Sequence, residues 1–192
     1  MSKDEVRGLR ETVILLEQEN ERLRQELGVS RVSDTIARGA FGEELVAGWA
    51  FGARAPRGLP HDLMIGALKV EVKYSGLLVQ LDRKQHRVCR WTWSKIFGER
   101  GKKQFDYLVL IGEADPRFRD SYKDPASPYV VFILSYWDAI RLCGGIKAGL
   151  AGRIACTTNP LTVRAREPKW LFNDFQWRAI DVGYFFKCSQ PI

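Results

Sequence analysis

Apolar residues at the N-terminus follow a seven-residue repeat with alternating steps of three and four. The a positions hold Val6, Val13, Asn20 and Leu27, and the d positions hold Leu9, Leu16 and Leu23. β-Branched residues at a with leucine at d favour a parallel two-stranded coiled coil, and one buried asparagine at an a position specifies that state. Residues 1–28 therefore predict a coiled-coil helix that joins two copies of the chain and ends at Gly28. The alternative is an amphipathic helix packed on its own domain.

Residues 29–192 alternate between helix-like and strand-like patterns. Helical spacing begins near Ser33 or Asp34 and runs through Trp49, and two-residue alternation over Leu68–Tyr74 predicts a strand. Further strands are expected at Phe105–Ile111 and Tyr129–Leu134, a helix at Ser135–Leu142, and loop or turn segments at Ala53–Pro60 and Asp62–Gly66. This mixture predicts a single α/β domain with a core of four or five strands flanked by helices.

The composition adds constraints on the class of protein. The chain has 192 residues, of which 45% are hydrophobic and 28% charged, enough to form a core without disulfides or metal. Its longest apolar stretches are far shorter than the ~20 residues of a membrane span, and the charged N-terminus lacks the apolar segment of a signal peptide. We therefore expect a cytoplasmic protein that does not bind membranes. The cysteines, which lack C-x-x-C spacing and are expected to be buried free thiols, are Cys89, Cys143, Cys156 and Cys188.

The net charge of +7 is unevenly distributed. Residues 1–27 hold five Lys/Arg against seven Asp/Glu, so residues 28–192 carry a net +9. One basic segment holds eight positive residues and one acid, and its basic members are Arg83, Lys84, Arg87, Arg90, Lys95, Arg100, Lys102 and Lys103. Because phosphate contacts dominate nucleic-acid affinity, this segment predicts a DNA-binding surface. The interleaved Trp91 and Trp93 are expected to pack inward, on a helix after the strand, rather than to stack on bases.

A second basic set lies in the C-terminal third of the chain. Its members are Arg164, Arg166, Lys169 and Arg178, accompanied by Trp170, Asn173 and Gln176. Arginine, asparagine and glutamine are the residue types that contact guanine and adenine edges in a major groove. This set is therefore the candidate region for sequence specificity.

One group of charged residues has the composition of a catalytic site. Asp62 lies in the turn region before the strand, and Glu71 and Lys73 lie two apart on that strand, so their side chains share a face. Glu43, with Glu44 as the alternative, lies on the preceding helix. Carboxylates bind a hard cation such as Mg²⁺, which activates a water for phosphodiester hydrolysis, and a lysine steadies the developing charge. The alternative is a surface salt bridge on an edge strand.

This arrangement resembles the PD-(D/E)XK nucleases, the restriction-endonuclease-like superfamily. Asp62 is followed by eight residues and then Glu71-Val72-Lys73, and the helix before it carries Gly39-x-x-x-Glu43, as in Holliday junction resolvases of that superfamily. One departure is that His61 directly precedes Asp62, with Pro60 displaced by one position. The resemblance covers residues 39–75, extends loosely to Phe105–Ile111 as the next core strand, and implies a restriction-endonuclease-like mixed sheet flanked by helices.

The resemblance also implies roles for the residues. Asp62, Glu71 and the main chain of Val72 would hold Mg²⁺, with Mn²⁺ as a substitute, and Glu43 would bind the metal through water or at a second site. Lys73 would orient or help deprotonate the attacking water. Together with the coiled coil of residues 1–28, the nuclease domain of residues 29–192 predicts a homodimeric Mg²⁺-dependent deoxyribonuclease acting on double-stranded DNA, most simply a type II restriction endonuclease. A dimer places one site on each strand of a duplex.

Two alternatives to a restriction enzyme remain. One is a structure-selective nuclease of the Holliday-junction-resolvase type, which recognises DNA shape. The other is a non-catalytic coiled-coil DNA-binding protein with a vestigial acidic set. RNA also stays open as the nucleic acid.

Overall fold

The computed structural model describes residues 36–56, 59–81, 87–99, 101–143, 151–161 and 171–190. The chain divides into two units, Met1–Arg38 and Gly39–Ile192. The expected coiled coil of residues 1–28 lies outside the described residues, and it stays a prediction. The second unit is mixed α/β, as the alternating patterns predict.

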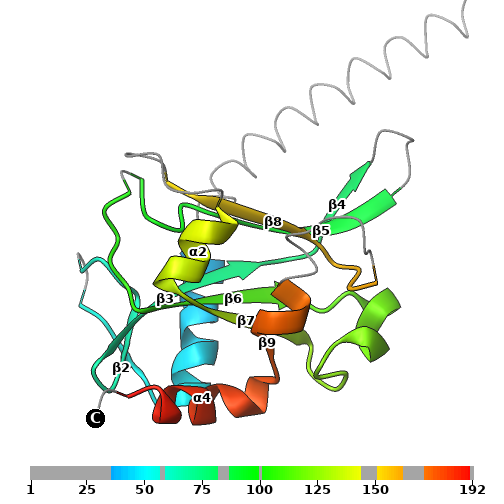
Figure 1. Cartoon of the computed structure of the whole chain (residues 1–192). Coiled ribbons are helices and arrows are strands. Elements are labelled where there is room, and N and C mark those ends of the chain that lie inside the picture. The colour runs from blue at the N-terminus through cyan, green and yellow to red at the C-terminus, as the bar shows by residue number, and fades with distance from the viewer. Residues whose placement is uncertain are drawn as a thin grey trace, which may run out of the picture. The chain divides into compact units, whose positions relative to one another are not determined.

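A six-stranded mixed sheet forms the centre of this unit (Figure 1). In spatial order its strands are β1 (Ala53–Arg54), β2 (Leu63–Ile65), β3 (Leu68–Ser75), β6 (Tyr107–Glu113), β7 (Tyr129–Ser135) and β9 (Gln176–Trp177). Strands β3 and β6 pair in parallel, and the other neighbours pair antiparallel. The expectation of a turn at Asp62–Gly66 is only partly right, because Leu63–Ile65 forms a strand against Leu68–Val70 and the turn is confined to Gly66 and Ala67.

A separate three-stranded antiparallel sheet consists of β4 (Leu78–Leu81), β5 (Arg87–Ser94) and β8 (Arg153–Thr157), with β5 in the middle. The expectation of a helix around Trp91 and Trp93 is therefore wrong. Both tryptophans are fully buried, as expected, but at a spacing of two on the inner face of a strand. With six strands in one sheet and three in another, the described residues also exceed the expected four or five.

Helices cover both faces of the central sheet (Figure 1). The described helices are residues 36–50, α2 (Tyr136–Leu142) and α4 (Val182–Cys188), with short turns of helix η1 (Pro116–Ser121), η2 (Leu171–Phe175) and η3 (Ala179–Asp181). Ser135 caps α2 by accepting a hydrogen bond from the Asp138 N–H, which places the start of this helix where the sequence predicts it. None of the described helices is both long and apolar enough to span a membrane.

The core forms two layers because residues alternate along the buried strands. On β6, Val109 and Ile111 pack with residues 36–50 and α4, while Leu108 and Leu110 pack with the tryptophans of β5 on the opposite face. The central strands are thus apolar on both faces, which is typical of a sheet covered on each side. All described cysteines are free, but only Cys156 is buried, and the expected burial of the other three is wrong.

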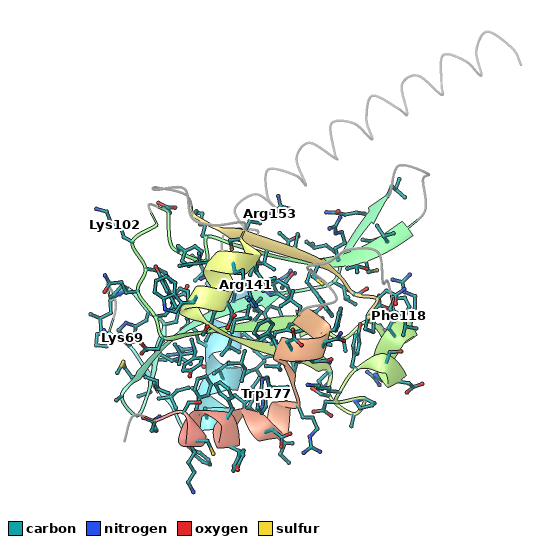
Figure 2. The ribbon with its side chains drawn as sticks, viewed as in Figure 1. Lys69, Lys102, Phe118, Arg141, Arg153 and Trp177 are labelled. Atoms are coloured by element: carbon teal, nitrogen blue, oxygen red, sulfur yellow. The ribbon has the colours of Figure 1, made fainter. Side chains whose placement is uncertain are left out.

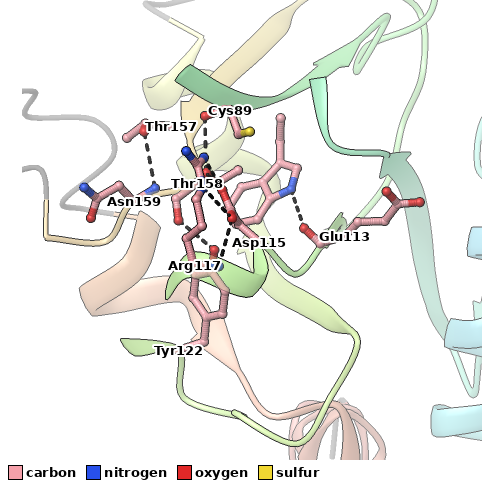
Figure 3. A network of polar contacts seen from close by, with 9 residues as sticks. Cys89, Glu113, Asp115, Arg117, Tyr122, Thr157, Thr158 and Asn159 are labelled. Atoms are coloured by element: carbon pink, nitrogen blue, oxygen red, sulfur yellow. Dashed lines mark hydrogen bonds and ion pairs between the residues drawn. The ribbon is translucent and has the colours of Figure 1, made fainter. Parts of the chain in front are cut away.

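A buried aspartate joins the two sheets at the end of β6 (Figure 3). Asp115 accepts hydrogen bonds from Arg117 Nε at 3.0 Å and Nη2 at 2.7 Å, and from Thr158 Oγ1 at 2.7 Å. The Thr158 backbone N–H donates to the Cys89 carbonyl of β5 at 3.1 Å, and Tyr122 donates to the Thr158 carbonyl. The hydrogen bonds from Arg117, aided by the one from Thr158, lower the pKa of Asp115 to about 2 despite its burial.

We expect Asp115→Asn to lower the free energy of unfolding by about 1–2 kcal/mol at pH 7. This is less than the pKa shift alone would give, because solvent screens the half-exposed Arg117 partner. Because the folded-state pKa lies below the ordinary 3.8, the carboxylate stabilises the fold above that value, and this contribution disappears as the pH falls toward 2. Urea unfolding of the wild type and Asp115→Asn between pH 7 and pH 2 measures the difference. A difference that stays constant over this range would contradict the role given to the Asp115 charge.

Candidate active site

The candidate site lies where β3 extends beyond β2. Strand β2 pairs with β3 only as far as Val70, so within the described residues no strand covers that edge of β3 from Glu71 onward. Asp62 covers it instead: its N–H donates to the Val70 carbonyl at 3.1 Å, and its Oδ2 accepts from the Val72 N–H at 2.9 Å. Because the N–H and C=O of a strand residue point to the same side, the Val72 carbonyl is directed toward the Asp62 edge.

Glu71 and Lys73 share a face of β3, as their spacing predicts, and Lys73 Nζ donates to Glu71 Oε1. The Glu71 side chain has no solvent exposure, and the Lys73 side chain is about one-fifth exposed. Val70 and Val72 point to the opposite face, where they are buried in the apolar layer under residues 36–50. The alternative of a surface salt bridge does not apply, because Glu71 is buried.

A second lysine joins this pair from a distant part of the chain. Lys103, in the loop before β6, donates from Nζ to Asp62 Oδ1 at 3.1 Å and also to Glu71 Oε1. One ammonium thus connects the two carboxylates that the sequence proposes as metal ligands. The sequence places Lys103 only in a general phosphate-binding set, and its separation of 32 residues from Glu71 leaves no local signal for this contact.

Burial dominates the electrostatics of Glu71. Desolvation raises its pKa to about 7, and the Asp62 charge adds to this rise, while the Lys73 and Lys103 charges oppose it. Burial alone lowers the pKa of Lys103, but the Glu71 and Asp62 charges outweigh it and raise that pKa. Glu71 Oε2 is buried and has no hydrogen-bond partner. The folded chain therefore holds a buried carboxyl group of which one oxygen is bound by two ammonium groups and the other has no partner.

Glu43 is the closer of the two helix carboxylates to this group. Its pKa is raised by burial and by the Asp62 charge, and the Arg54, Lys73 and Lys103 charges lower it, which places it within electrostatic reach of the site. Its nearest ion pair is with Arg54 Nε at 3.6 Å, and Arg54 also lies 3.6 Å from Glu44. Glu44 is largely exposed, whereas Glu43 is less exposed and interacts electrostatically with the site, so Glu43 is the better candidate of the two. Arg54 was not among the expected site residues.

The carboxylates do not form a complete metal cage. Among the residues that the structure describes, no three His, Cys, Asp or Glu side chains gather closely enough to enclose one ion. Glu43 stands apart from Asp62 and Glu71, which share Lys103. Two carboxylates are nevertheless a usual protein contribution to Mg²⁺, which keeps several waters and takes other oxygens from substrate phosphates. The unpartnered Glu71 Oε2 and the Val72 carbonyl edge fit such a partial site.

The proposed DNA-binding residues have different surroundings. Lys102 is exposed and points away from the body (Figure 2). Lys95 is exposed and paired with Glu99 at 2.7 Å, and Arg90 on β5 is half-buried with an unpartnered Nε. Of Arg87 only the backbone is described, and outside the described residues lie Arg83, Lys84, Arg100, Arg164, Arg166 and Lys169.

The candidate specificity region is corrected at Gln176, while the role expected for the exposed Arg178 stays a prediction. Gln176 is buried on β9, and its side chain is therefore withheld from a DNA groove. Arg178 forms a two-bond ion pair with Asp181, with Nε to Oδ2 at 2.6 Å and Nη2 to Oδ1 at 3.0 Å. Asn173 is exposed on η2, and Trp170 lies outside the described residues.

Comparison of the chain with protein-family models, with curated proteins and with solved structures finds no match.

Proposed function

We propose that this protein is a homodimeric, Mg²⁺-dependent DNA endonuclease of the PD-(D/E)XK type, most simply a type II restriction endonuclease. The observation that carries the proposal is the convergence of Asp62, Glu71 and Lys73 on one edge of β3, with the two carboxylates bound to a single cationic group. A mixed sheet flanked by helices agrees with the restriction-endonuclease-like fold that the resemblance implies.

The metal part of the proposal rests on the buried, unpartnered oxygen of Glu71 and on the second carboxylate beside it. A buried carboxylate with one unpartnered oxygen is stabilised by a nearby cation, and Asp62 adds a second carboxylate beside it. Asp62, Glu71 and the Val72 carbonyl would hold Mg²⁺ or Mn²⁺, with Glu43 contributing through water. Bound there, the cation would supply charge neutralisation at the scissile phosphate and a more acidic water.

Lys73 would act on the attacking water. Its ammonium is held by Glu71, and its side chain remains partly exposed, so a water or phosphate can reach it. A positive group fixed beside the reacting phosphate stabilises negative charge that develops in the transition state. Asp62 has a positioning role as well, because it joins the turn before β2 to the Val72 backbone and so fixes the edge.

The DNA part of the proposal rests on charge. Lys95, Lys102 and Arg90 supply positive groups within the described residues, and the remaining basic residues of the two predicted sets extend this charge along the chain. Phosphate contacts of this kind position a duplex without reading its sequence. They agree equally with a restriction enzyme and with a structure-selective nuclease.

Cleavage assays test the proposal. The purified full chain is incubated with a long duplex of mixed sequence and with a four-way junction, in Mg²⁺ and in EDTA. Discrete duplex fragments that depend on Mg²⁺ support the restriction-type function, and preferential junction cleavage supports the resolvase-type alternative. DNA binding without cleavage of either substrate in Mg²⁺ or Mn²⁺ would contradict a nuclease and favour the non-catalytic DNA-binding protein.

The homodimer belongs to the same proposal and depends on the heptads of residues 1–27, which hold none of the proposed site residues. Deleting them is expected to give a monomer at micromolar concentration and to convert paired cuts into single-strand nicks, since the two sites are then no longer joined. Sedimentation measures the mass, and nicking of supercoiled plasmid measures the pairing of cuts. A truncated chain that sediments as a tight dimer would locate the interface elsewhere.

A further inference from the structure

We propose that Lys103 is a second lysine of the active site, which holds the Asp62 and Glu71 carboxylates together in the position of the divalent cation. It releases them when the cation binds, and its freed ammonium then pairs with the DNA phosphate. This inference rests on the proposed function, because it takes Asp62 and Glu71 as the metal ligands.

The contacts of Lys103 differ from those of Lys73. Lys103 Nζ binds Asp62 Oδ1 and Glu71 Oε1, whereas Lys73, among the residues that the structure describes, forms its ion pair with Glu71 and not with Asp62. A cation shared by two carboxylates occupies the space between their oxygens, which is where a divalent ion bound by both would lie. Lys103 therefore competes with the metal for position, while Lys73 stands to one side of it.

The backbone of Lys103 is fixed close to the site. Its N–H donates to the Phe97 carbonyl at 3.0 Å, and the next N–H, from Gln104, donates to the Pro60 carbonyl at 3.2 Å. The stem of the side chain lies against Gly98, where an added Cβ would approach Lys103 Cγ to 3.0 Å. The loop is thus tied to the chain just before Asp62, and the ammonium can leave the carboxylates by rotation of its flexible stem alone.

Charge balance explains why the ammonium would leave. When Glu71 is ionised, the two negative charges of Asp62 and Glu71 are matched in number by Lys73 and Lys103, so the group has no net charge without metal. A divalent ion added between the carboxylates repels an ammonium in the same space strongly, because the site is partly buried. A DNA phosphate supplies the missing negative charge, and the partly exposed Lys103 side chain can turn toward it. Metal and DNA are therefore expected to strengthen each other's binding.

Mn²⁺ binding to the full chain without DNA tests this inference, measured by the loss of the free-ion signal in electron paramagnetic resonance. Lys103→Met, which keeps an unbranched stem and removes the charge, is expected to bind Mn²⁺ about 10-fold more tightly than the wild type. Lys73→Met removes the other ammonium group that binds Glu71 Oε1, and we expect a smaller increase in Mn²⁺ affinity, roughly 3-fold or less. Lys102→Met, at an exposed neighbour, is expected to leave the affinity unchanged.

Cleavage at saturating Mn²⁺ provides the second measurement. Loss of the phosphate partner is expected to slow Lys103→Met by roughly 10-fold at the same time as its metal affinity rises. Damage to the fold would lower both quantities together, so the opposite directions distinguish a role in the site from a structural one. Thermal unfolding of each variant accompanies the assay.

The outcomes separate this inference from the proposed function. If the wild type binds Mn²⁺, Glu71→Gln does not, and Lys103→Met binds it no more tightly than the wild type, the role of Lys103 is overturned and the metal site stands. If the wild type binds no Mn²⁺ at millimolar concentration, with or without duplex DNA, both the metal site and the role of Lys103 are overturned. Tighter binding in Lys103→Met than in Lys73→Met supports the inference.

Discussion

Glu71→Gln is expected to lower the rate of Mg²⁺-dependent DNA cleavage by roughly 10³-fold or more, while DNA binding is kept or strengthened. The amide has the shape of the carboxylate but no charge, so the shared cation position between Asp62 and Glu71 loses half of its negative charge. The same loss removes repulsion toward a phosphate, and affinity for the duplex therefore does not fall. Asp62→Asn is expected to act in the same way, since Asp62 supplies the other carboxylate.

Gel-based cleavage in Mg²⁺ and fluorescence anisotropy in Ca²⁺ measure the two quantities separately. Glu99→Gln is the matched control, because it makes the same chemical change at an exposed residue paired with Lys95. Its cleavage rate is expected to stay within about twofold of the wild type, as for other surface changes remote from the chemistry. Full activity in both Glu71→Gln and Asp62→Asn would remove these residues from the proposed site.

Trp91→Ala is expected to lower the free energy of unfolding by about 3–5 kcal/mol, the range for truncating a large buried aromatic side chain. Trp91 is fully buried on β5, its ring packs edge-on against Phe132, and its Nε1 donates to the Glu113 carbonyl at 2.8 Å. The alanine leaves a cavity between the two sheets and an unpartnered carbonyl at the end of β6. Gly112 of β6 lies directly under the indole, where an added Cβ would come within 2.5 Å of the ring.

Guanidinium unfolding followed by circular dichroism measures this loss. Trp137→Ala is the control, because Trp137 at the start of α2 is mostly exposed, and its removal is expected to change stability by less than about 0.5 kcal/mol. If Trp91→Ala lowers the free energy of unfolding no more than Trp137→Ala does, the packing of Trp91 between the two sheets does not stabilise the domain as its burial indicates. A normal cleavage rate in folded Trp91→Ala would agree with a structural role for this residue.

Local patterns are sufficient for β3, β7 and α2. The alternation of Leu68–Tyr74 places Glu71 and Lys73 on one face because the period of a strand is two, whatever it pairs with. Ser135 marks the start of α2 because its hydroxyl caps the first free N–H groups. These features depend on residues that are close in the chain, which is why pattern alone predicts them.

Three expectations from the sequence are wrong or only partly right. Leu63–Ile65 has three residues, too few for periodicity, and it becomes a strand because β3 lies beside it across a two-residue turn. Trp91 and Trp93 lie two residues apart, which places both side chains on one face of a strand but on opposite sides of a helix, so the expected helix does not fit their inward packing. The segment is a strand between β4 and β8. Gln176 is buried because β9 pairs with β7, and this burial, which the sequence does not indicate, prevents its side chain from contacting DNA.

Some features of the candidate site also follow from local spacing, and others depend on contacts between distant segments. Composition and short-range spacing predict the mixed α/β class, the positive charge of residues 28–192, and the Asp62, Glu71 and Lys73 group, because each depends on composition or on residues within about eleven positions of one another. Three features of the site are visible only in the folded chain: Lys103 connects the two carboxylates, Arg54 pairs with Glu43, and Glu71 is buried with a raised pKa. Burial and ion pairing across distant segments depend on which surfaces the fold brings together, and side-chain spacing along the chain carries no information on that.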